Sequence, residues 1–298
     1  MNALYLNAGI SKQGHWQAIE REREWEANAQ SYLGFIAEVR DIHPGMGLRA
    51  IYEQYQPEGI GRDAFIALGR ALGMMVETKR NQARTTFSIK HHRYRNLLEG
   101  RIFNNINQVW VSDITYFHVL ERFYYLTFLM DACSRRIVGF NVASSLRAEH
   151  ALSALQMALT LRGIPDYRQA LIHHSDRGSQ YIANDYTDTL SNYGILCSMC
   201  DNVLENAHSE RVNGTIKNQY LAHWHQYIRS EELLHKYTLR AVTTYNTERV
   251  HSSIGMTPVR YEAHLATLSE HQRPQFTIYA GSPKVELPTH QLPIEWGR

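Results

Sequence analysis

The sequence predicts an α/β fold in which helices flank a mixed five-stranded sheet, preceded by a separate helical region. Three observations favour this fold. Roughly the first 78 residues show apolar positions at helical spacing, and after residue 104 short apolar or β-branched runs alternate with helical stretches. The composition is that of an ordinary globular protein, with 44% hydrophobic and 20% charged residues over 298 positions, enough to bury a substantial core.

The composition also indicates where the protein works. No run approaches the roughly 18–20 apolar residues that a membrane helix needs, and the N-terminus lacks an export signal pattern. We therefore expect no membrane association and a cytoplasmic protein. Cys197 and Cys200 form a C-x-x-C without a second pair of cysteine or histidine ligands, so we interpret them as structural residues and not as a zinc or redox site.

The N-terminal helical region, residues 1–78, contains a predicted helix-turn-helix. The stretch IHPGMGLRAIY (Ile42–Tyr52) places a Pro-Gly turn before one helix, and GIGRDAFIALGRALG (Gly59–Gly73) places a Gly-rich turn before a second. The motif is weak by itself, because most helix pairs bind nothing. Its candidate DNA contacts are three arginines expected on the surface: Arg49, Arg62 and Arg70.

Residues 79–104 form a predicted basic linker. The net charge of the chain is only +2, but Lys, Arg and His residues are concentrated between Lys79 and Arg101, where the only acid is Glu99. Such a segment is either a solvated linker, the commoner case, or an arm that follows DNA phosphates, and both interpretations stay open. Arg93 and Arg95 are its candidate DNA contacts.

Residues 105–265 carry the predicted sheet, and residues 266–298 form a C-terminal tail. The expected elements of the sheet region run strand, strand, strand, helix, strand, helix, strand, helix: Val109–His118, Phe123–Asp131, Arg136–Ala143, Ala148–Leu161, Gln169–His174, Ile182–Tyr193, Ile195–Met199 and Ala207–Trp224. Hairpin-joined strands followed by parallel crossovers give a mixed sheet with helices on its faces. This order is the ribonuclease H-like one, although the order alone would also suit several other α/β folds, and the positions of the acidic residues narrow the choice.

Three acidic residues are unusual in this region. Asp113 interrupts an otherwise apolar strand, where a lone acid is costly to bury unless it is paired or binds a cation. Asp176 follows the fourth strand, and Glu210 lies on the last helix. Singly, each has an ordinary explanation: a hydrogen bond or ion pair for Asp113, a helix N-cap for Asp176 and solvent exposure for Glu210.

Together the three acids indicate a metal site. Neighbouring central strands would bring Asp113 and Asp176 side by side, and a helix packed across the sheet would bring Glu210 over them. Carboxylates that close repel one another unless cations lie between them. Oxygen ligands with open positions suit Mg²⁺ or Mn²⁺, and two such ions can activate an attacking oxygen and stabilise the leaving oxygen of a phosphodiester.

Several segments resemble one protein family, in the same order along the chain. They are WVSDITYF (Trp110–Phe117), HHSDRGSQY (His173–Tyr181), SNYGI (Ser191–Ile195), ENAHSERVNGTIK (Glu205–Lys217) and YNTERVHSSIGMTPVRYE (Tyr245–Glu262). These segments are similar to the integrase-type core of bacterial insertion-sequence transposases, above all the second-reading-frame (orfB-type) group, which shares its DDE core with retroviral integrases. The N-terminal helix pair resembles that group's accessory helix-turn-helix, so the resemblance covers about residues 35 to 265.

The resemblance implies a DNA transposase that needs divalent metal. Asp113, Asp176 and Glu210 would be its catalytic metal-binding triad, with two Mg²⁺ or Mn²⁺ ions. Lys217, seven residues after Glu210 and on the same helical face, would contact the DNA end near the scissile phosphate. Cleavage at an element end would leave a 3′-hydroxyl that attacks another phosphodiester, giving a circular intermediate before integration.

Other motif positions and partners follow from the same resemblance. Four residues are expected to shape the site: Trp110, Thr115, Gln180 and Tyr181. The last of the quoted segments, Tyr245–Glu262, matches the closing motif of that group. Three of its residues match motif positions, with helix-end capping as an equal alternative for their role: Asn246, Arg249 and His251. The implied partners are terminal inverted repeats, target DNA, further copies of the chain on DNA, and an upstream-frame transposase subunit. This chain has no heptad array of its own, so dimerisation could depend on that subunit.

One departure from the family concerns the third acid. Asp176 and Glu210 enclose 33 residues, slightly fewer than is usual, and the shortfall falls near Cys200. Asp201 and Glu205 are nearby alternatives, but only Glu210 keeps the family spacing to Lys217. Two other functions stay open. A catalytically silent DNA-binding regulator is disfavoured by the intact acids, and a ribonuclease H-type nuclease would leave the helix-turn-helix and the closing motif unexplained.

Overall fold

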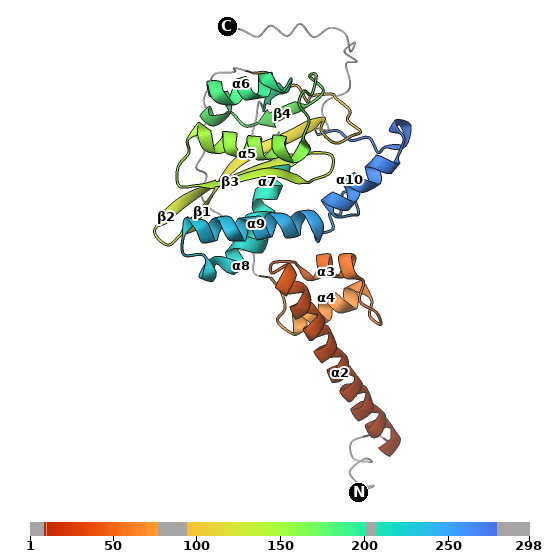
Figure 1. Cartoon of the computed structure of the whole chain (residues 1–298). Coiled ribbons are helices and arrows are strands. Elements are labelled where there is room, and N and C mark those ends of the chain that lie inside the picture. Colours follow the sequence, from red (N-terminus) through yellow and green to blue (C-terminus); the bar gives the residue numbers. More distant parts are fainter. Residues whose placement is uncertain (1–8, 10, 77–93, 201–206, 279–298) are drawn as a thin grey trace. The chain divides into compact units, whose positions relative to one another are not determined.

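The computed structural model describes residues 9, 11–76, 94–200 and 207–278 (Figure 1). The chain divides into two compact units, Met1–Lys79 and Arg80–Arg298. Three parts of the sequence lie outside the described residues: most of the predicted basic linker, the two alternative acids Asp201 and Glu205, and the end of the predicted tail. No helix in the described ranges is long and apolar enough to cross a membrane.

The first unit is helical, as predicted. A long helix, α2 (Lys12–Ile42), begins at Ser11, whose hydroxyl accepts a hydrogen bond from the backbone of Gly14. The two predicted short helices are present as α3 (Leu48–Tyr55) and α4 (Arg62–Ala71). Gly69 of α4 lies so close to Leu48 of α3 that a Cβ atom would collide with it. The core of the unit is small: Ile36, Val39, Met46, Leu48, Ile51 and Phe65.

The second unit contains the predicted five-stranded mixed sheet, with strand order β3-β2-β1-β4-β5. The strands are β1 (Val109–Val119), β2 (Arg122–Asp131), β3 (Ile137–Ala143), β4 (Ile172–Ser175) and β5 (Leu196–Met199). β1 to β3 are antiparallel, whereas β4 and β5 run parallel to β1. β4 is shorter than predicted because Arg168 and Gln169 adopt positive φ and form a turn before it. This is the ribonuclease H-like topology.

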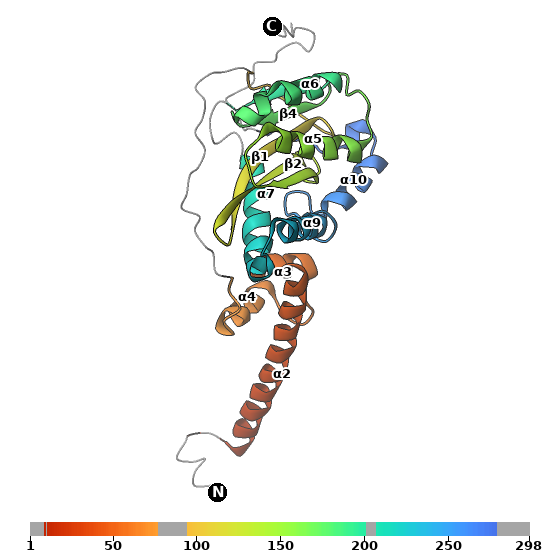
Figure 2. The ribbon, with the colours of Figure 1, turned by 60° about the vertical axis from the view of Figure 1, so that its left-hand side comes forward.

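Helices cover both faces of this sheet (Figures 1 and 2). α5 (Ala148–Arg162) packs on one face with α6 (Asn184–Asn192), which follows a 3-10 turn at Ser179–Ile182. Gly139 of β3 contacts the backbone of Ala154 in α5, and a Cβ atom there would collide with it. The close approach of α5 to β3 therefore requires glycine at this position.

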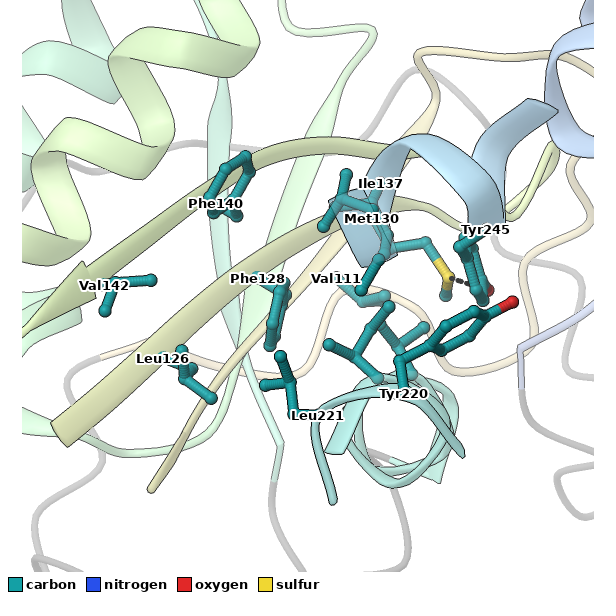
Figure 3. Close-up of a cluster of buried hydrophobic side chains, with 14 of the residues drawn as sticks. Val111, Leu126, Phe128, Met130, Ile137, Phe140, Val142, Tyr220, Leu221 and Tyr245 are labelled. Carbon is teal, nitrogen blue, oxygen red and sulfur yellow. Dashed lines mark hydrogen bonds between the residues drawn. The ribbon is translucent and has the colours of Figure 1, made fainter. Parts of the chain in front are cut away.

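The other face is covered by one continuous helix in three segments. α7 (Ala207–Gly214) continues into a π-helical segment, η3 (Thr215–Leu221), and then into α8 (Ala222–Trp224). α9 (Glu231–Thr247) lies beside it and was not predicted from the sequence. Figure 3 shows the core between them: side chains of β1, β2 and β3 meet Tyr220, Leu221 and Tyr245, and the Tyr245 hydroxyl points to the sulfur of Met130.

The closing motif forms a buried polar latch between α10 (Pro258–Thr267) and the sheet. Arg162 at the end of α5 donates two hydrogen bonds to the Glu262 carboxylate, at 2.6 and 2.9 Å. Arg136 and Ser134, from the β2–β3 turn, donate further bonds of 2.6 and 2.8 Å. The side chains of Glu262 and Arg162 are only 10% and 8% exposed, so this bidentate pair is shielded from solvent.

We predict that Glu262→Gln destabilises the chain by about 3 kcal/mol, because it leaves Arg162 buried without its main counter-charge. Chemical unfolding of the full chain, followed by circular dichroism, measures the loss. Glu149→Gln is the matched control, since the Glu149 side chain is 61% exposed, and its effect should stay within about 0.5 kcal/mol. Equal losses in the two variants would contradict the latch.

Candidate active site

The register of β1 and β4 brings two of the three candidate acids to the same place. Ser112 of β1 pairs with Ser175, the last residue of β4, and Asp113 and Asp176 each come directly after one of these serines. Asp113 lies on the sheet face that α7 covers, alongside the apolar Val109 and Val111. Asp176 follows the end of β4, and its Oδ1 accepts a 3.0 Å hydrogen bond from the backbone of Gly178.

The electrostatics of Asp113 are unusual. Burial, and then the neighbouring charge of Asp176, raise the pKa of Asp113 to about 8, with a smaller contribution from Glu210. Burial likewise raises the pKa of Asp176. None of the three acids forms an ion pair within the part of the chain that the structure describes. The three carboxylates are thus close enough to interact, and none of them is paired directly with a cation among the described residues.

The helix that carries Glu210 presents a polar stripe to β1. Asn213, one turn after Glu210, donates from Nδ2 to Oδ2 of Asp113 at 2.7 Å. Lys217 donates from Nζ to the hydroxyl of Thr115 at 2.9 Å, and its Nζ lies 4.7 Å from the centroid of the Tyr116 ring. Glu210 itself is exposed in the first turn of α7. Glu210, Asn213 and Lys217 therefore share the helical face that the sequence predicted.

The helix is not a regular α-helix between these residues. η3 begins at Thr215, so Lys217 lies in π-helical backbone. π-helical turns are rare and occur often at functional sites. Here the wider turn coincides with the burial of Lys217, which is 9% exposed. Burial lowers the pKa of Lys217, while the nearby charge of Asp113 opposes that shift.

The four motif residues expected to shape the site divide into two groups. Thr115 contacts Lys217 directly, and Tyr181 lies beneath Asp113, with its hydroxyl 2.9 Å from the Ser112 hydroxyl. Gln180 donates to the carbonyl of Leu146. Trp110 is fully buried on the opposite face of the sheet, so it supports the core and does not line the site.

The donor set fits a hard divalent cation by its chemistry. Carboxylate oxygens are the ligands that Mg²⁺ and Mn²⁺ prefer, and the uncompensated negative charge around Asp113 would be relieved by a cation. Within the described ranges, however, no three His, Cys, Asp or Glu side chains converge tightly enough to form a ready-made metal cage. Glu210, the exposed member, would have to turn toward the two aspartates.

The candidate DNA contacts in the first unit are exposed, and two of them have acidic partners. Arg49 pairs with Glu53 at 2.7 Å and Arg62 with Asp63 at 3.0 Å. Arg70 is exposed in the last turn of α4. Arg95 is exposed in the second unit, whereas Arg93 lies outside the described residues.

The closing motif has a structural role that sequence reasoning missed. The Asn246 side chain accepts a hydrogen bond from the backbone N–H of Ile137 and donates one to its carbonyl, both 2.9 Å long. It thus pairs with an edge strand and does not cap a helix. His251 stacks edge-on against Tyr245, with ring centroids 4.5 Å apart. No local pattern indicates the contact between Asn246 and Ile137, because these residues lie 109 positions apart in the chain.

The second unit of the chain is similar to known integrase core domains. Two models described as integrase core domain match residues 104–202 and 201–258. Among solved structures, the catalytic core of HTLV-2 integrase, determined with magnesium in a trimeric form, is 20% identical, with a TM-score of 0.44 over 56% of this chain and 99% of that one. A simian T-cell lymphotropic virus intasome in complex with the PP2A regulatory subunit B56 gamma gives 17% identity and a TM-score of 0.48, over 84% and 80%.

Relatives from insertion sequences match over most of their length. The 31-kDa protein of insertion element IS600 from Shigella sonnei is 31% identical, over 83% of this chain and 92% of that protein. The IS629 transposase from the same organism is also 31% identical, over 72% and 73%. The IS904 transposase of Lactococcus lactis is 27% identical, over 70% and 88%. The chain therefore belongs to the insertion-sequence transposases that carry an integrase core domain.

Proposed function

We propose that Asp113, Asp176 and Glu210 are the catalytic acids of this DNA transposase and together hold divalent metal, two Mg²⁺ or Mn²⁺ ions. Membership of the family already makes the chain a polynucleotidyl transferase. The observation that carries the finer proposal is the grouping of three acids, none in a direct ion pair among the described residues, around the face between β1 and α7. Nothing in the described structure favours a silent DNA-binding regulator.

Each residue of the site has a distinct part in the proposed reaction. Bound metal supplies positive charge that polarises the phosphodiester and activates the attacking oxygen. Asn213 fixes the orientation of Asp113 through its 2.7 Å hydrogen bond. Lys217, whose charge acts on Asp113, is proposed to contact the DNA end near the scissile phosphate. Thr115 holds the Lys217 ammonium in place for that contact.

The proposed reaction is cleavage followed by strand transfer. Water attacks a phosphodiester at the element end, a new P–O bond forms, and the bond to the 3′-oxygen breaks to leave a 3′-hydroxyl. That hydroxyl attacks a phosphodiester at the element's other end: a P–O bond to the attacking oxygen forms, and the bond to the 3′-oxygen of the flanking strand breaks and leaves a hydroxyl there. Cleavage of the joined circular intermediate frees the element's 3′-hydroxyls again, and these attack target DNA in the same way, so no covalent bond to the protein is needed. Because two inverted repeats must be held together, we propose that copies of the chain assemble on DNA, with an upstream-frame subunit as a further partner.

Asp176→Asn should abolish Mg²⁺-dependent cleavage and joining of a duplex that carries the terminal inverted repeat from the DNA flanking the gene. Binding of that duplex should persist, because the change removes one negative charge and no phosphate contact. Asp188→Asn, at an exposed position of α6, is the control and should stay fully active. A fully active Asp176→Asn enzyme would exclude the assigned chemistry.

Metal binding has a readout that does not depend on activity. Mg²⁺ should raise the melting temperature of the wild-type chain by a few degrees, since a ligand that binds only the folded state stabilises it. Asp113→Asn should lose most of that rise and should melt above the wild type in EDTA, because one of the repelling charges is gone. Asp188→Asn again serves as the control. An unchanged Mg²⁺ response in Asp113→Asn would contradict its role as a ligand.

The Lys217→Met variant tests whether Lys217 takes part in the reaction with DNA or only stabilises the fold. Replacing a buried charge by an apolar side chain of similar length typically costs little or stabilises, so the free energy of unfolding should fall by no more than about 1 kcal/mol. Joining of the repeat duplex should nevertheless be lost. Lys236→Met, at an exposed position of α9, should leave both measurements unchanged. A strongly destabilised but active Lys217→Met variant would assign the lysine to folding alone.

A further inference from the structure

Three arginines gather beside the start of α7 without acidic partners. Arg135 comes from the β2–β3 turn, Arg211 follows Glu210 on α7, and Arg249 follows α9. None of the three takes part in an ion pair within the described ranges. Guanidinium groups that are close together repel one another, so a cluster of this kind is stable only when something compensates its charge.

Hydrogen bonds and ring contacts define the cluster. Arg135 lies 2.8 Å from Nδ1 of His208 in the first turn of α7, and because a guanidinium can only donate, that nitrogen must accept. His251, two residues after Arg249, packs against the ring of Tyr245. The charges of all three arginines act on Tyr245, and those of Arg249 and Arg135 act on His251. All three guanidinium groups therefore lie near Tyr245.

Two buried polar atoms in this region lack a partner. Nη1 of Arg249 and Nε2 of His251 are shielded from solvent, and neither forms a hydrogen bond in the described structure. A buried guanidinium N–H without an acceptor is costly, and so its presence indicates a missing acceptor. Burial and the charges of Arg249 and Arg135 lower the pKa of His251 to about 3, so this ring adds no further positive charge.

We propose that Arg135, Arg211 and Arg249 bind one backbone phosphate of the DNA, next to the phosphate that is cleaved. The inference rests on the proposed function. Glu210 and Arg211 are adjacent in the sequence, so a DNA strand that is bound at Glu210 passes the arginine cluster. Guanidinium groups match phosphate oxygens in geometry and charge. The cluster would fix the position of the strand on one side of the scissile bond.

The test compares Arg249→Gln with Arg229→Gln in the full chain. Arg229 is exposed beyond α8, some 25 Å from the start of α7 at about 1.5 Å per helical residue, which makes it a matched control. Binding of the repeat duplex is measured by fluorescence anisotropy over a range of KCl concentrations. Arg249→Gln should weaken binding at least tenfold and reduce the slope of log K against log salt by about 0.9, the value for one phosphate contact.

Melting temperatures distinguish this role from a structural one. Arg249→Gln removes a repelling charge and breaks no ion pair of the described residues, so it should melt at or above the wild-type temperature. A lower melting temperature with unchanged DNA binding would mean that the cluster holds an acidic group of the protein, and would overturn the proposal. So would affinity and salt slope equal to those of Arg229→Gln.

A DNA-free measurement separates this proposal from the proposed function. Inorganic phosphate should raise the melting temperature of the wild type and of Arg229→Gln more than that of Arg249→Gln, at matched ionic strength. If the wild type failed to bind the repeat duplex but kept this phosphate response, the transposase chemistry would fail and the anion site would stand. Equal phosphate responses in all three proteins would overturn the anion site, whatever happens with DNA.

Discussion

The carboxylate of Asp113 is half-buried on the otherwise apolar face of the central strand, and the arrangement around it follows from the cost of partly desolvating that charge. Asn213 donates to it from one side, and the backbone of Ile114 donates from the other. The charge of Lys217 also acts on it. These contacts fix the rotation of the α7–η3 helix about its axis, because Asn213 and Lys217 must both face β1. The apolar side of the same helix can then enter the core through Val212 and Ile216.

Most of the fold could be predicted because its signals are local. Apolar periodicity distinguishes strands from helices, and the strand order follows from hairpins and parallel crossovers. The register that brings Asp113 and Asp176 together follows from the same topology. α9 was missed because its buried residues, such as Leu234, Thr238 and Asn246, include polar side chains and give only a weak apolar stripe. The π-helical segment was missed because backbone geometry of this kind has no sequence signature of its own.

The candidate site was less predictable than the fold. The choice of Glu210, Asn213 and Lys217 as one face could be made from spacing alone. By contrast, nothing in the spacing indicated that Lys217 would be buried against Thr115 and Tyr116, as it is in the structure. The arginine cluster was beyond sequence reasoning, since Arg135 and Arg249 lie more than a hundred residues apart and meet only through the packing of α9 on the sheet.

The pairing of Asn246 with β3 has a consequence for assembly. β3 is an outer strand of the sheet, and outer strands expose N–H and C=O groups that another chain can join. The Asn246 amide satisfies both backbone groups of Ile137, so the first residue of β3 cannot accept a strand from a neighbour. One carboxamide thus protects that end of the sheet from edge-to-edge aggregation. Copies of the protein that crowd on one DNA molecule are in this way kept from joining through sheet extension there.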